Sequence, residues 1–387
     1  MIHDYFPNIY VDRAVAHTFK SIADGLELAG LPLTRYAYAN GLPADRRVVS
    51  AVPIRGFRYT SRFKGTLDSL LKFKVERRAQ PGDWAYLWMD TDLRWADRLR
   101  QGGVRLAKEM INCPLALKEQ ILARAYASIG EVCPDLPSRE AIEAEIRHAQ
   151  AMDAVFCPNP EVLKAMVDIG VDPGRCVAAS YGWSPARING SSRHHPVEGD
   201  ELTLLFCGTL DVRKGAGTLL SAWQQAAVPG KLIIAGAIDP LIARKFERVL
   251  ARPDVLCLGH VADVGSVYRS ANAFVLPTWE EGGPMVTLEA MSQGLPCMVT
   301  RMGTAGAFTE NDGAGIVVEP GDVDQLVAGI RRWSLDADER MRFGAKARLL
   351  AQEFTWEAIS QRRALTFQSP ELSSEALSDH AFPLRRC

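Results

Sequence analysis

Two cations follow a glycine in the segment FCGTLDVRKG, which occupies positions 206–215. The segment comes after an apolar run, and a helical pattern begins just after Gly217. In an open parallel sheet, ligands bind beyond the carboxyl ends of the strands, where helix N-termini offer free amides to anions. Gly208 lets the backbone approach a ligand closely, while Arg213 and Lys214 supply a planar fork and a point charge suited to a diphosphate. Taken alone, the loop is equally consistent with a surface turn whose charges are solvated.

The segment PTWEEGGPMVTLEAM at 277–291 repeats this pattern, with an apolar strand, a loop containing Gly282 and Gly283, and a helix. Pro284 suits the first helical position, where its missing N–H would have no partner in any case. Three amides would then be unpaired donors at the positive end of the helix dipole, those of Met285, Val286 and Thr287. The segment therefore predicts a second group of anion donors.

Glu281 and Glu289 lie beside these donors. Carboxylates cannot be there to hold phosphate, because like charges repel. Ionised carboxylates only accept hydrogen bonds, so their natural partners are hydroxyls, including the vicinal diol of a ribose or a sugar. Phosphate donors and diol acceptors together describe a site for a sugar nucleotide. The alternative is a capped surface helix with solvated glutamates.

Short apolar runs alternate with amphipathic helical patterns over the 387 residues, which predicts an α/β chain with parallel sheets. A chain of this length exceeds the usual size of one hydrophobic core, so two domains are expected. The expected strands are 33–38, 48–54, 85–89, 104–107, 154–157 and 176–179 in the first half, and 202–207, 231–235, 255–258, 273–276, 297–300 and 316–318 in the second. Helical patterns include 115–129, 160–169 and 218–227.

The predicted architecture is two Rossmann-like domains facing each other across a cleft. We expect an N-terminal acceptor-side domain at 1–185, a polar linker rich in helix breakers at 186–200, and a nucleotide-sugar-binding domain at 201–352. A C-terminal helix at 353–368 is expected to pack back on the N-terminal domain, and a polar tail follows at 369–387.

Composition excludes several other classes of protein. The net charge of −1 argues against a protein that coats nucleic acid. The eight cysteines contain no pair at zinc spacing and are interpreted as buried, reduced thiols, including Cys207 and Cys257. The chain begins without a basic and apolar leader and contains no run of ~18 apolar residues. A cytoplasmic protein is expected.

Several short motifs resemble the retaining glycosyltransferases of family 4, which belong to glycosyl transferases group 1. The strongest is the Glu281-x7-Glu289 pair with the following Ala-Met. The supporting motifs are Arg213-Lys214-Gly215, Gly259-His260-Val261, Gln293-Gly294-Leu295-Pro296, Asp312-Gly313-Ala314-Gly315, Asp153-Ala154-Val155 and Ser180-Tyr181-Gly182. The resemblance covers roughly residues 145–367, and its combined spacing is specific although each motif is not.

This resemblance implies the GT-B fold and a retaining hexosyltransferase that needs no metal and no cofactor, with a nucleotide diphosphate sugar as co-substrate. It implies that Glu281, Lys214 and Arg213 form the catalytic group. The donor would be bound by Gly208, Thr209, His260, Val261, Gly282, Gly283, Pro284, Met285, Val286 and Glu289. Relatives often carry an arginine at the position of Thr209, and Arg213 is expected to take its role.

The N-terminal domain departs from the family pattern, because the chain begins MIHDYFPN without a glycine-rich loop. We expect its first strand to be very short or replaced. Loops after the strands should face the cleft, which makes His17, Asp90, Asp92, Lys108 and Glu109 candidates for acceptor contacts. Each is also consistent with an ordinary surface or core position.

Asp90-Thr91-Asp92 supports a rival hypothesis, because two aspartates at this spacing after an apolar strand can hold Mg²⁺ or Mn²⁺ against a diphosphate. That would indicate a metal-dependent transferase with the single-domain GT-A fold. The second half of the chain has no place in that fold, so the rival is disfavoured.

Ten Arg and Lys residues fall between positions 46 and 78, against only Asp68 and Glu76, with aromatic and apolar residues among them. Such a basic amphipathic stretch is typical of contact with an anionic membrane or a lipid-phosphate acceptor. A solvated helix that packs its apolar side on the sheet explains the same pattern.

Three functions from different classes remain. The first is a transferase that moves a sugar from a nucleotide diphosphate sugar to a glycan, a lipid-linked acceptor or a small-molecule hydroxyl, as in polysaccharide biosynthesis. The second is an epimerase or phosphorylase on the same scaffold, and the third is a catalytically silent binding protein. A Rossmann dehydrogenase is disfavoured because no strand precedes a G-x-G-x-x-G motif.

Overall fold

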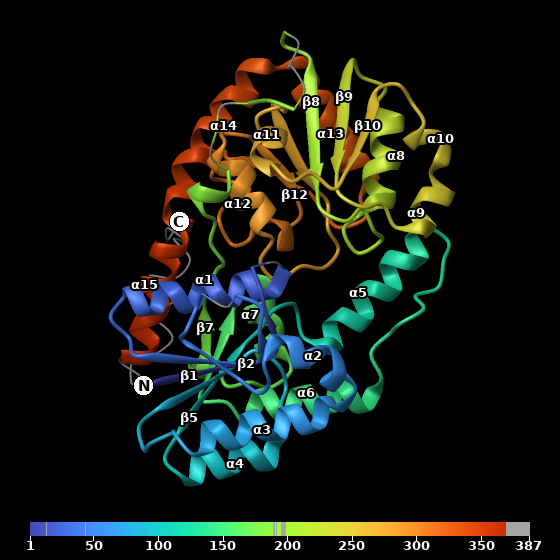
Figure 1. Cartoon of the computed structure of the whole chain (residues 1–387). Helices are drawn as coiled ribbons and strands as arrows, with labels where there is room; N and C mark the ends of the chain where they lie inside the picture. Colours follow the sequence, from blue (N-terminus) through green and yellow to red (C-terminus); the bar gives the residue numbers. More distant parts are fainter. Residues whose placement is uncertain (13, 43, 189, 191, 195–198, 369–387) are drawn as a thin grey trace.

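The computed structural model describes residues 1–368, apart from positions 13, 43, 189, 191 and 195–198. The expected tail at 369–387 and part of the expected linker lie outside these residues. The described chain forms two α/β domains, each built on one parallel sheet (Figure 1). The predicted pair of Rossmann-like domains is confirmed.

The N-terminal sheet has seven strands in the order β3-β2-β1-β4-β5-β6-β7, and every pair is parallel. Its strands are β1 Ile2–Tyr10, β2 Leu33–Asn40, β3 Val48–Ser50, β4 Trp84–Leu87, β5 Arg105–Glu109, β6 Ala154–Cys157 and β7 Cys176–Ala178. The helices of this half are α1 Ala14–Leu28, α2 Ile54–Thr60, α3 Lys64–Glu76, α4 Leu93–Gln101, α5 Leu115–Ser128, α6 Arg139–Gln150 and α7 Pro160–Asp168. Helices cover both faces, which explains the continuous apolar runs of the inner strands.

The C-terminal sheet has six parallel strands in the order β10-β9-β8-β11-β12-β13. They are β8 Leu202–Cys207, β9 Gly230–Ala235, β10 Val255–Gly259, β11 Ala273–Leu276, β12 Cys297–Val299 and β13 Gly315–Val317. The helices are α8 Ala216–Ala226, α9 Pro240–Lys245, α10 Glu247–Leu250, α11 Val264–Tyr268, α12 Met285–Ser292, α13 Val323–Leu335, α14 Ala337–Ala351 and α15 Trp356–Gln368. All six residues of β8 are buried, so this strand lies at the centre of the domain core.

The expectation for the first strand was wrong, because β1 runs over nine residues and lies inside the sheet between β2 and β4. Two of its buried residues are polar, which concealed the strand in the sequence. Each has a partner that flanks the Trp84–Leu87 strand: Oδ1 of Asp4 accepts a 2.8 Å bond from Nε1 of Trp88, and Nε2 of His3 lies 3.0 Å from Oδ2 of Asp83. Their partners come from distant parts of the chain.

Smaller differences concern single elements. The strand expected at 48–54 ends at Ser50, and residues 46–78 form β3, α2, a short 3-10 turn and α3 rather than one helix. Pro284 is the N-cap of α12 rather than its first residue, and α8 begins at Ala216, earlier than expected. Cys257 is exposed rather than buried, because β10 is an edge strand whose residues alternate in exposure.

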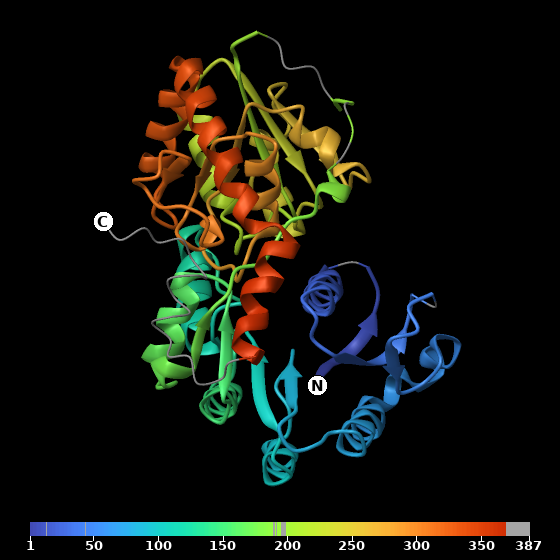
Figure 2. The same cartoon turned by 90° about the vertical axis from the view of Figure 1, so that its left-hand side faces the viewer.

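The chain crosses between the domains at two adjacent segments. Trp183 and Thr355 form a parallel bridge, and Nε1 of Trp183 donates a 2.7 Å bond to the carbonyl of Ala351. Beyond this point α15 leaves the C-terminal domain and packs beside α1, as Figure 2 shows from the side. Arg363 of α15 forms a buried 2.6 Å ion pair with Glu109 of β5, so the last helix is held by the N-terminal domain.

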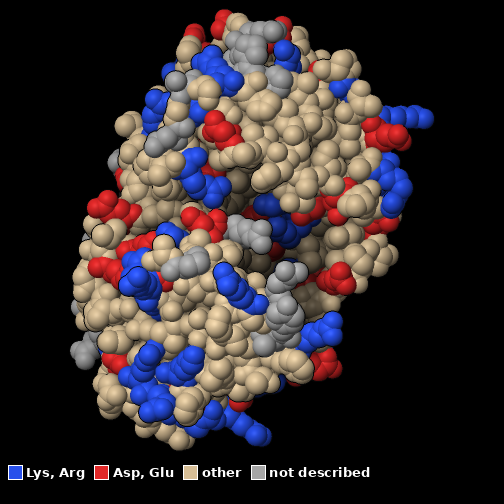
Figure 3. Space-filling model, in the orientation of Figure 1, with Lys and Arg blue, Asp and Glu red and all other residues tan. Residues whose placement is uncertain are grey.

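The domains also meet where α5 approaches the C-terminal domain (Figure 1). Nζ of Lys245 lies 2.8 Å from Oε1 of Glu131, just beyond α5. A Cβ on Gly217 of α8 would come within 2.4 Å of the Ile129 side chain, so this close approach requires glycine. Contacts on this side and at the crossing point together fix the groove between the domains, whose opening is visible in Figure 3.

Candidate active site

The loop after β8 is locked against the loop after β11. Gly215 has φ +77°, and a Cβ there would come within 2.0 Å of the carbonyl oxygen of Pro277. The carbonyl of Arg213 accepts bonds from the backbone N–H of Trp279 at 2.8 Å and from the hydroxyl of Thr278 at 3.1 Å. The two loops singled out by the sequence therefore form one structural unit.

Arg213 and Lys214 converge on one carboxylate in this unit. Nη1 of Arg213 lies 3.1 Å from Oε1 of Glu281, and Nζ of Lys214 donates to the same oxygen. Burial raises the pKa of Glu281, but the charges of Lys214 and Arg213 outweigh it and lower the pKa below its usual range. Two cations thus share one anionic partner, an arrangement in which an incoming diphosphate can bind the same cations.

Gly208 lies beneath Lys214. It has φ +129°, and a Cβ there would meet the end of the Lys214 side chain at 3.7 Å. Its neighbour Thr209 is exposed, as is His260 after β10, while Val261 is half-buried. These residues lie at the carboxyl edge of the C-terminal sheet, as expected from the sequence. In the part of the chain that the structure describes, no hydrogen bond or ion pair ties them to the ionic cluster.

The start of α12 offers two backbone donors. Among the described residues, no hydrogen-bond partner accepts from the amides of Met285 and Val286. The amide of Thr287 was expected to be a third free donor, but it donates a 3.1 Å bond to the carbonyl of Pro284. The start of this helix therefore offers two free amides and the positive end of the helix dipole.

Glu289 lies one helix turn further along α12 and is only 2% exposed. Its Oε2 accepts a 2.9 Å bond from the Tyr268 hydroxyl, and its Oε1 lies 3.3 Å from Nε of Arg187. Burial raises its pKa, and the charges of Arg187 and of His17, together with the Tyr268 bond, oppose that rise. His17 belongs to α1, so a residue of the opposite domain influences the pKa of Glu289.

The N-terminal domain closes over the loop that carries Gly282 and Gly283. A Cβ on Gly282 would come within 1.8 Å of the Ile111 carbonyl oxygen, and one on Gly283 within 2.6 Å of the Tyr181 ring. Nδ2 of Asn159 donates to the carbonyls of Glu281 and Gly282. Both glycines are thus required by interdomain packing, in addition to any contact with a ligand.

Glu280 also bridges the domains, although the sequence gave no reason to separate it from Glu281. It is fully buried, and its Oε1 accepts a 3.2 Å bond from the Cys113 amide, while Oε2 lies 3.3 Å from Nη1 of Arg213. Glu280 therefore connects the cationic loop to the N-terminal domain. Asn159, Tyr268 and Arg187 were missed for the same reason, because their roles depend on contacts between distant segments.

Of the residues expected to contact the acceptor, His17, Lys108 and Asp90 lie near the groove and Glu109 does not. His17 lies 2.5 Å from Asp12 through Nδ1, on the helix that faces α12. Lys108 forms an ion pair with Asp90, whose side chain is 42% exposed. Glu109 does not face the groove, because its carboxylate is fully buried in the ion pair with Arg363 that anchors α15.

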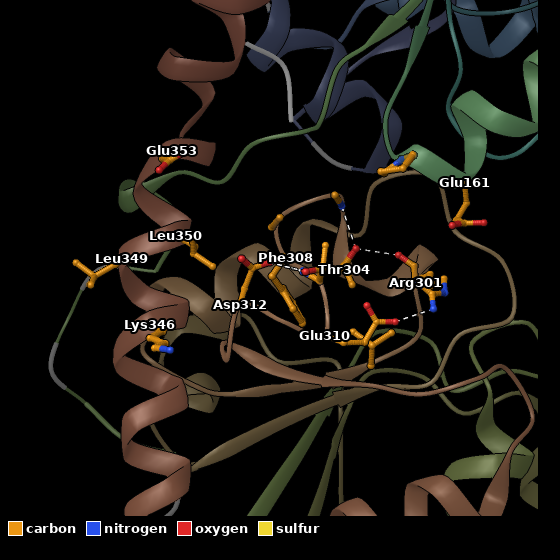
Figure 4. A pocket seen from close by; sticks show the side chains of 15 residues that line it. Glu161, Arg301, Thr304, Phe308, Glu310, Asp312, Lys346, Leu349, Leu350 and Glu353 are labelled. Atoms are coloured by element: carbon orange, nitrogen blue, oxygen red, sulfur yellow. Dashed lines mark hydrogen bonds and ion pairs between the residues drawn. The ribbon is translucent and has the colours of Figure 1, made fainter. Parts of the chain in front are cut away.

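Two pockets flank the groove. One, of ≈660 Å³, lies at the carboxyl edge of the N-terminal sheet and is lined by residues that include Tyr38, Lys64, Asp68 and Asp90. The other, of ≈530 Å³, lies between the loop at 301–312, α14 and the start of α7 (Figure 4). Figure 4 shows acidic and basic side chains mixed around the second pocket, including the Arg301 and Glu310 ion pair at 2.7 Å.

The proposed pairing of Asp90 and Asp92 on a metal finds no support in their contacts. Asp92 caps α4 by accepting a bond from the Arg94 amide, while Asp90 is held by Lys108. Among the described residues, no three His, Cys, Asp or Glu side chains gather in a way that could hold a metal ion. Within the same residues, no helix is both long and apolar enough to cross a membrane.

Known proteins resemble this chain in sequence. The family model of Glycosyl transferases group 1 matches residues 201–336. D-inositol 3-phosphate glycosyltransferase 2 of Catenulispora acidiphila is 25% identical over 75% of this chain and 72% of its own. O-antigen chain mannosyltransferase B of Escherichia coli is 34% identical over 40% of this chain and 42% of its own.

Solved structures match over both domains. HepE of Anabaena, in a complex with UDP, superimposes with a TM-score of 0.71 at 16% identity and covers 95% of this chain and all of its own. Sucrose-phosphate synthase from Thermosynechococcus elongatus gives 0.70 at 18% identity over 95% of this chain and 98% of its own. Residues 201–336 therefore form a domain of the glycosyl transferases group 1 family, in a chain with the GT-B fold.

Proposed function

We propose that the protein transfers a sugar from a nucleotide diphosphate sugar to a hydroxyl acceptor, with retention of anomeric configuration. One observation carries the proposal: Arg213 and Lys214 meet at Glu281 in the loop that leads into α12, whose first two amides are free, and the buried carboxylate of Glu289 lies one turn further along that helix. Phosphate donors next to an acceptor for ribose hydroxyls are what a nucleotide sugar requires.

The donor would bind with its diphosphate between Lys214 and the amides of Met285 and Val286, and with its ribose diol on Glu289. The diphosphate would replace Glu281 as the partner of the two cations. Glu281, released from them, would accept a bond from a hydroxyl of the donor sugar. Complexes of Anabaena HepE with UDP and with UDP-glucose support the choice of this ligand class.

Transfer would break the bond between C1 of the sugar and the diphosphate oxygen and form a bond from C1 to the acceptor oxygen on the same face. The departing diphosphate oxygen would take the acceptor proton, so no enzyme nucleophile is required. Arg213, Lys214 and the α12 amides would stabilise the charge that develops on the diphosphate. These fixed donors supply the positive charge that a metal would otherwise provide, so we propose a reaction without metal or other cofactor.

The acceptor would enter from the N-terminal domain, whose strand ends carry the ≈660 Å³ pocket. Glycans, lipid-linked sugars and small hydroxyl compounds are all candidates. Relatives named for O-antigen chain mannosyl transfer and for galactosyl transfer to a diphosphoundecaprenol-linked sugar support a role in polysaccharide assembly. We propose that the protein works in the cytoplasm, at the source of nucleotide sugars.

Contact with an anionic membrane through residues 46–78 is a further part of the proposal. Leu67, Leu71 and Val75 of α3 are buried on the sheet, which accounts for one apolar side of the helix. Phe63 and Phe73 are more than half exposed, and Lys and Arg gather at this lower end of the molecule (Figure 3). Exposed aromatic rings among cations favour binding to anionic lipid. Sedimentation with anionic vesicles tests this, and absence of binding would remove the membrane contact.

The transferase hypothesis is tested by incubating the protein with a panel of UDP-, GDP- and ADP-sugars and measuring released nucleoside diphosphate. Turnover of one donor supports it, and Lys214→Ala should abolish that turnover. Lys164→Ala, on the exposed face of α7, is the matched control. Binding of a donor without any turnover would instead favour a silent binding protein, and an altered sugar still attached to its nucleotide would favour an epimerase.

A further inference from the structure

The pocket at the carboxyl edge of the N-terminal sheet is built around two carboxylates. Asp90 follows β4 and Asp68 lies on α3, and both line the pocket. Phe57 and Met89 add apolar surface to the lining, and Tyr38 adds an aromatic ring. A cavity that combines apolar surface with a few fixed polar groups is typical of a site for a small ligand.

Two buried side chains, those of Lys108 and His148, contact Asp90 and hold it in place. Lys108, whose side chain is 5% exposed, pairs with Oδ1 of Asp90, and Nδ1 of His148, whose side chain is 2% exposed, lies 3.1 Å from the same oxygen. The shortest contacts therefore both use Oδ1, while 42% of the Asp90 side chain remains exposed. Asp90 can bind a ligand without giving up either partner.

The protonation state of His148 follows from its other nitrogen. Nε2 lies 3.1 Å from the backbone N–H of Thr91, which can only donate, so Nε2 is the acceptor and Nδ1 carries the proton. Burial lowers the pKa of His148, which keeps the ring neutral. Nδ1–H therefore lies on the side of Asp90, 3.1 Å from Oδ1, although without the alignment of a standard hydrogen bond.

These neighbours make Asp90 a permanent carboxylate. Burial raises its pKa, but the contact with His148 and the charge of Lys108 outweigh burial and lower the pKa to about 2. A carboxyl group with so low a pKa is a poor proton acceptor in catalysis but a good hydrogen-bond acceptor at every physiological pH. Its chemistry suits binding of a hydroxyl rather than removal of the hydroxyl proton.

Asp68 is also held by neighbouring side chains. Its Oδ1 accepts from the Tyr5 hydroxyl, and its Oδ2 lies 2.6 Å from Nζ of Lys72. Burial and the neighbouring Asp68 raise the pKa of Tyr38 to about 12, so the Tyr38 phenol stays protonated beside this carboxylate. Both carboxylates therefore have cationic or hydroxyl partners that fix their orientation.

We propose that this pocket binds the acceptor as an uncharged polyhydroxylated ring, a sugar or cyclitol without phosphate, whose hydroxyls donate to Asp90 and Asp68. This inference rests on the proposed transfer reaction and adds the chemical class of the acceptor. Asp90 and Asp68 are its binding residues, and Lys108 and His148 are positioning residues that act through Asp90.

The charges around the pocket exclude a phosphorylated ring. The positive charges of Lys72 and Lys108 are already paired with the two carboxylates, and among the described lining residues Lys64 is the one further cation, on the exposed surface of α3. A phosphate placed between two carboxylates would be repelled by both. This sets the chain apart from relatives named for inositol 3-phosphate, whose names specify a phosphate-bearing acceptor.

Direct binding to the full-length protein tests the inference without requiring turnover. Saturation-transfer NMR would compare methyl glycosides and inositol with the corresponding sugar phosphates and inositol 3-phosphate. The structure predicts binding of the uncharged rings and at least ~10-fold weaker binding of the phosphates, which corresponds to ~1.4 kcal/mol. Preferential binding of the phosphorylated compounds would overturn the inference. The free glycoside and a glycoside carried on a lipid present the same ring. Comparing their affinities therefore distinguishes a membrane-borne acceptor from a free one.

A first variant tests whether the glycoside binds at Asp90. Asp90→Asn should weaken glycoside binding about tenfold, the loss of one bond to a charged acceptor, and should leave nucleoside diphosphate affinity unchanged. Asp97→Asn, at an exposed position of α4, is the matched control. Unchanged glycoside binding in Asp90→Asn would overturn the role of Asp90.

A second variant covers the case in which Asp90→Asn does not fold. Gly65 lines the pocket, and a Cβ there meets no atom within 4 Å, so Gly65→Trp can be accommodated on α3 and should fill the pocket. It should abolish glycoside binding while donor affinity persists. Glycoside binding that persists in Gly65→Trp would show that the acceptor binds elsewhere. A wild-type protein that binds no nucleotide sugar would instead count against the proposed transfer reaction itself.

Discussion

Replacing Glu289 by glutamine tests the assignment of the donor ribose to α12. The change keeps the size of the side chain and removes its charge. The Tyr268 hydroxyl at 2.9 Å can still donate to the amide oxygen, so the fold around the residue should persist. What is lost is one of two oxygens that can accept from the vicinal diol of a ribose, together with the charge that strengthens both bonds.

The expected magnitude follows from the burial of this residue. Hydrogen bonds to a charged group contribute about 1.5–3 kcal/mol, and 1.4 kcal/mol corresponds to a factor of ten in affinity. Glu289 is only 2% exposed, so water cannot replace the lost interaction. Glu289→Gln should therefore weaken nucleoside diphosphate binding about 10- to 100-fold.

Isothermal titration calorimetry with paired ligands isolates the effect. A nucleoside diphosphate that lacks both ribose hydroxyls should bind wild type and Glu289→Gln equally, because it makes no bond to this residue. Glu310→Gln, which affects an exposed ion pair with Arg301, serves as the control and should change neither affinity. Equal weakening of both ligands by Glu289→Gln would refute the contact with the ribose.

The pH dependence of stability and of nucleotide affinity gives an independent test of Glu289. Burial raises the pKa of Glu289 above 4.5, so the folded state binds this proton more tightly than the unfolded chain does. The contribution of Glu289 to stability is therefore fully present below pH 4.5 and is lost as the pH rises through the raised pKa. Relative to Glu289→Gln, the free wild-type protein should become more stable on acidification through this range, whereas its nucleotide affinity should fall.

Three further predictions concern the rest of the site and its support. Lys214→Ala should reduce transfer by orders of magnitude with an unchanged melting temperature, and unchanged turnover would exclude Lys214 from the site. Arg363→Met should cost about 3–5 kcal/mol in chemical denaturation because it leaves the Glu109 carboxylate buried and unpaired, and a double variant with Glu109→Gln should recover part of that loss. Gly215→Ala should lower both stability and donor affinity, because its φ of +77° and the Pro277 carbonyl at 2.0 Å leave no room for a Cβ, whereas Gly65→Ala should be neutral.

The C-terminal domain could be predicted from the sequence because its elements are short apolar runs followed by loops with glycine and charge. The strands at Leu202–Cys207 and Ala273–Leu276 were expected at these bounds. Both loops that follow them carry local signals, namely glycines, a proline before a helix and paired charges. Local signals of this kind are visible without knowledge of tertiary contacts.

The N-terminal domain was harder to predict because its determinants are contacts between distant residues. Strand β1 contains His3 and Asp4, which are polar but fully buried, and which contact Asp83 and Trp88 about 80 positions away. Glu109 resembled a groove residue until Arg363, 254 positions away, was seen to neutralise it. His148 could not be linked to Asp90 for the same reason. Pairings at such separation leave no local pattern in a single sequence.

A crystal structure of the protein with a bound nucleoside diphosphate tests the central claim most directly. The account predicts that the diphosphate lies between Lys214 and the amides of Met285 and Val286, with the ribose against Glu289. A nucleotide found instead in the pocket between the 301–312 loop and α14, or one whose phosphates point away from α12, would contradict it.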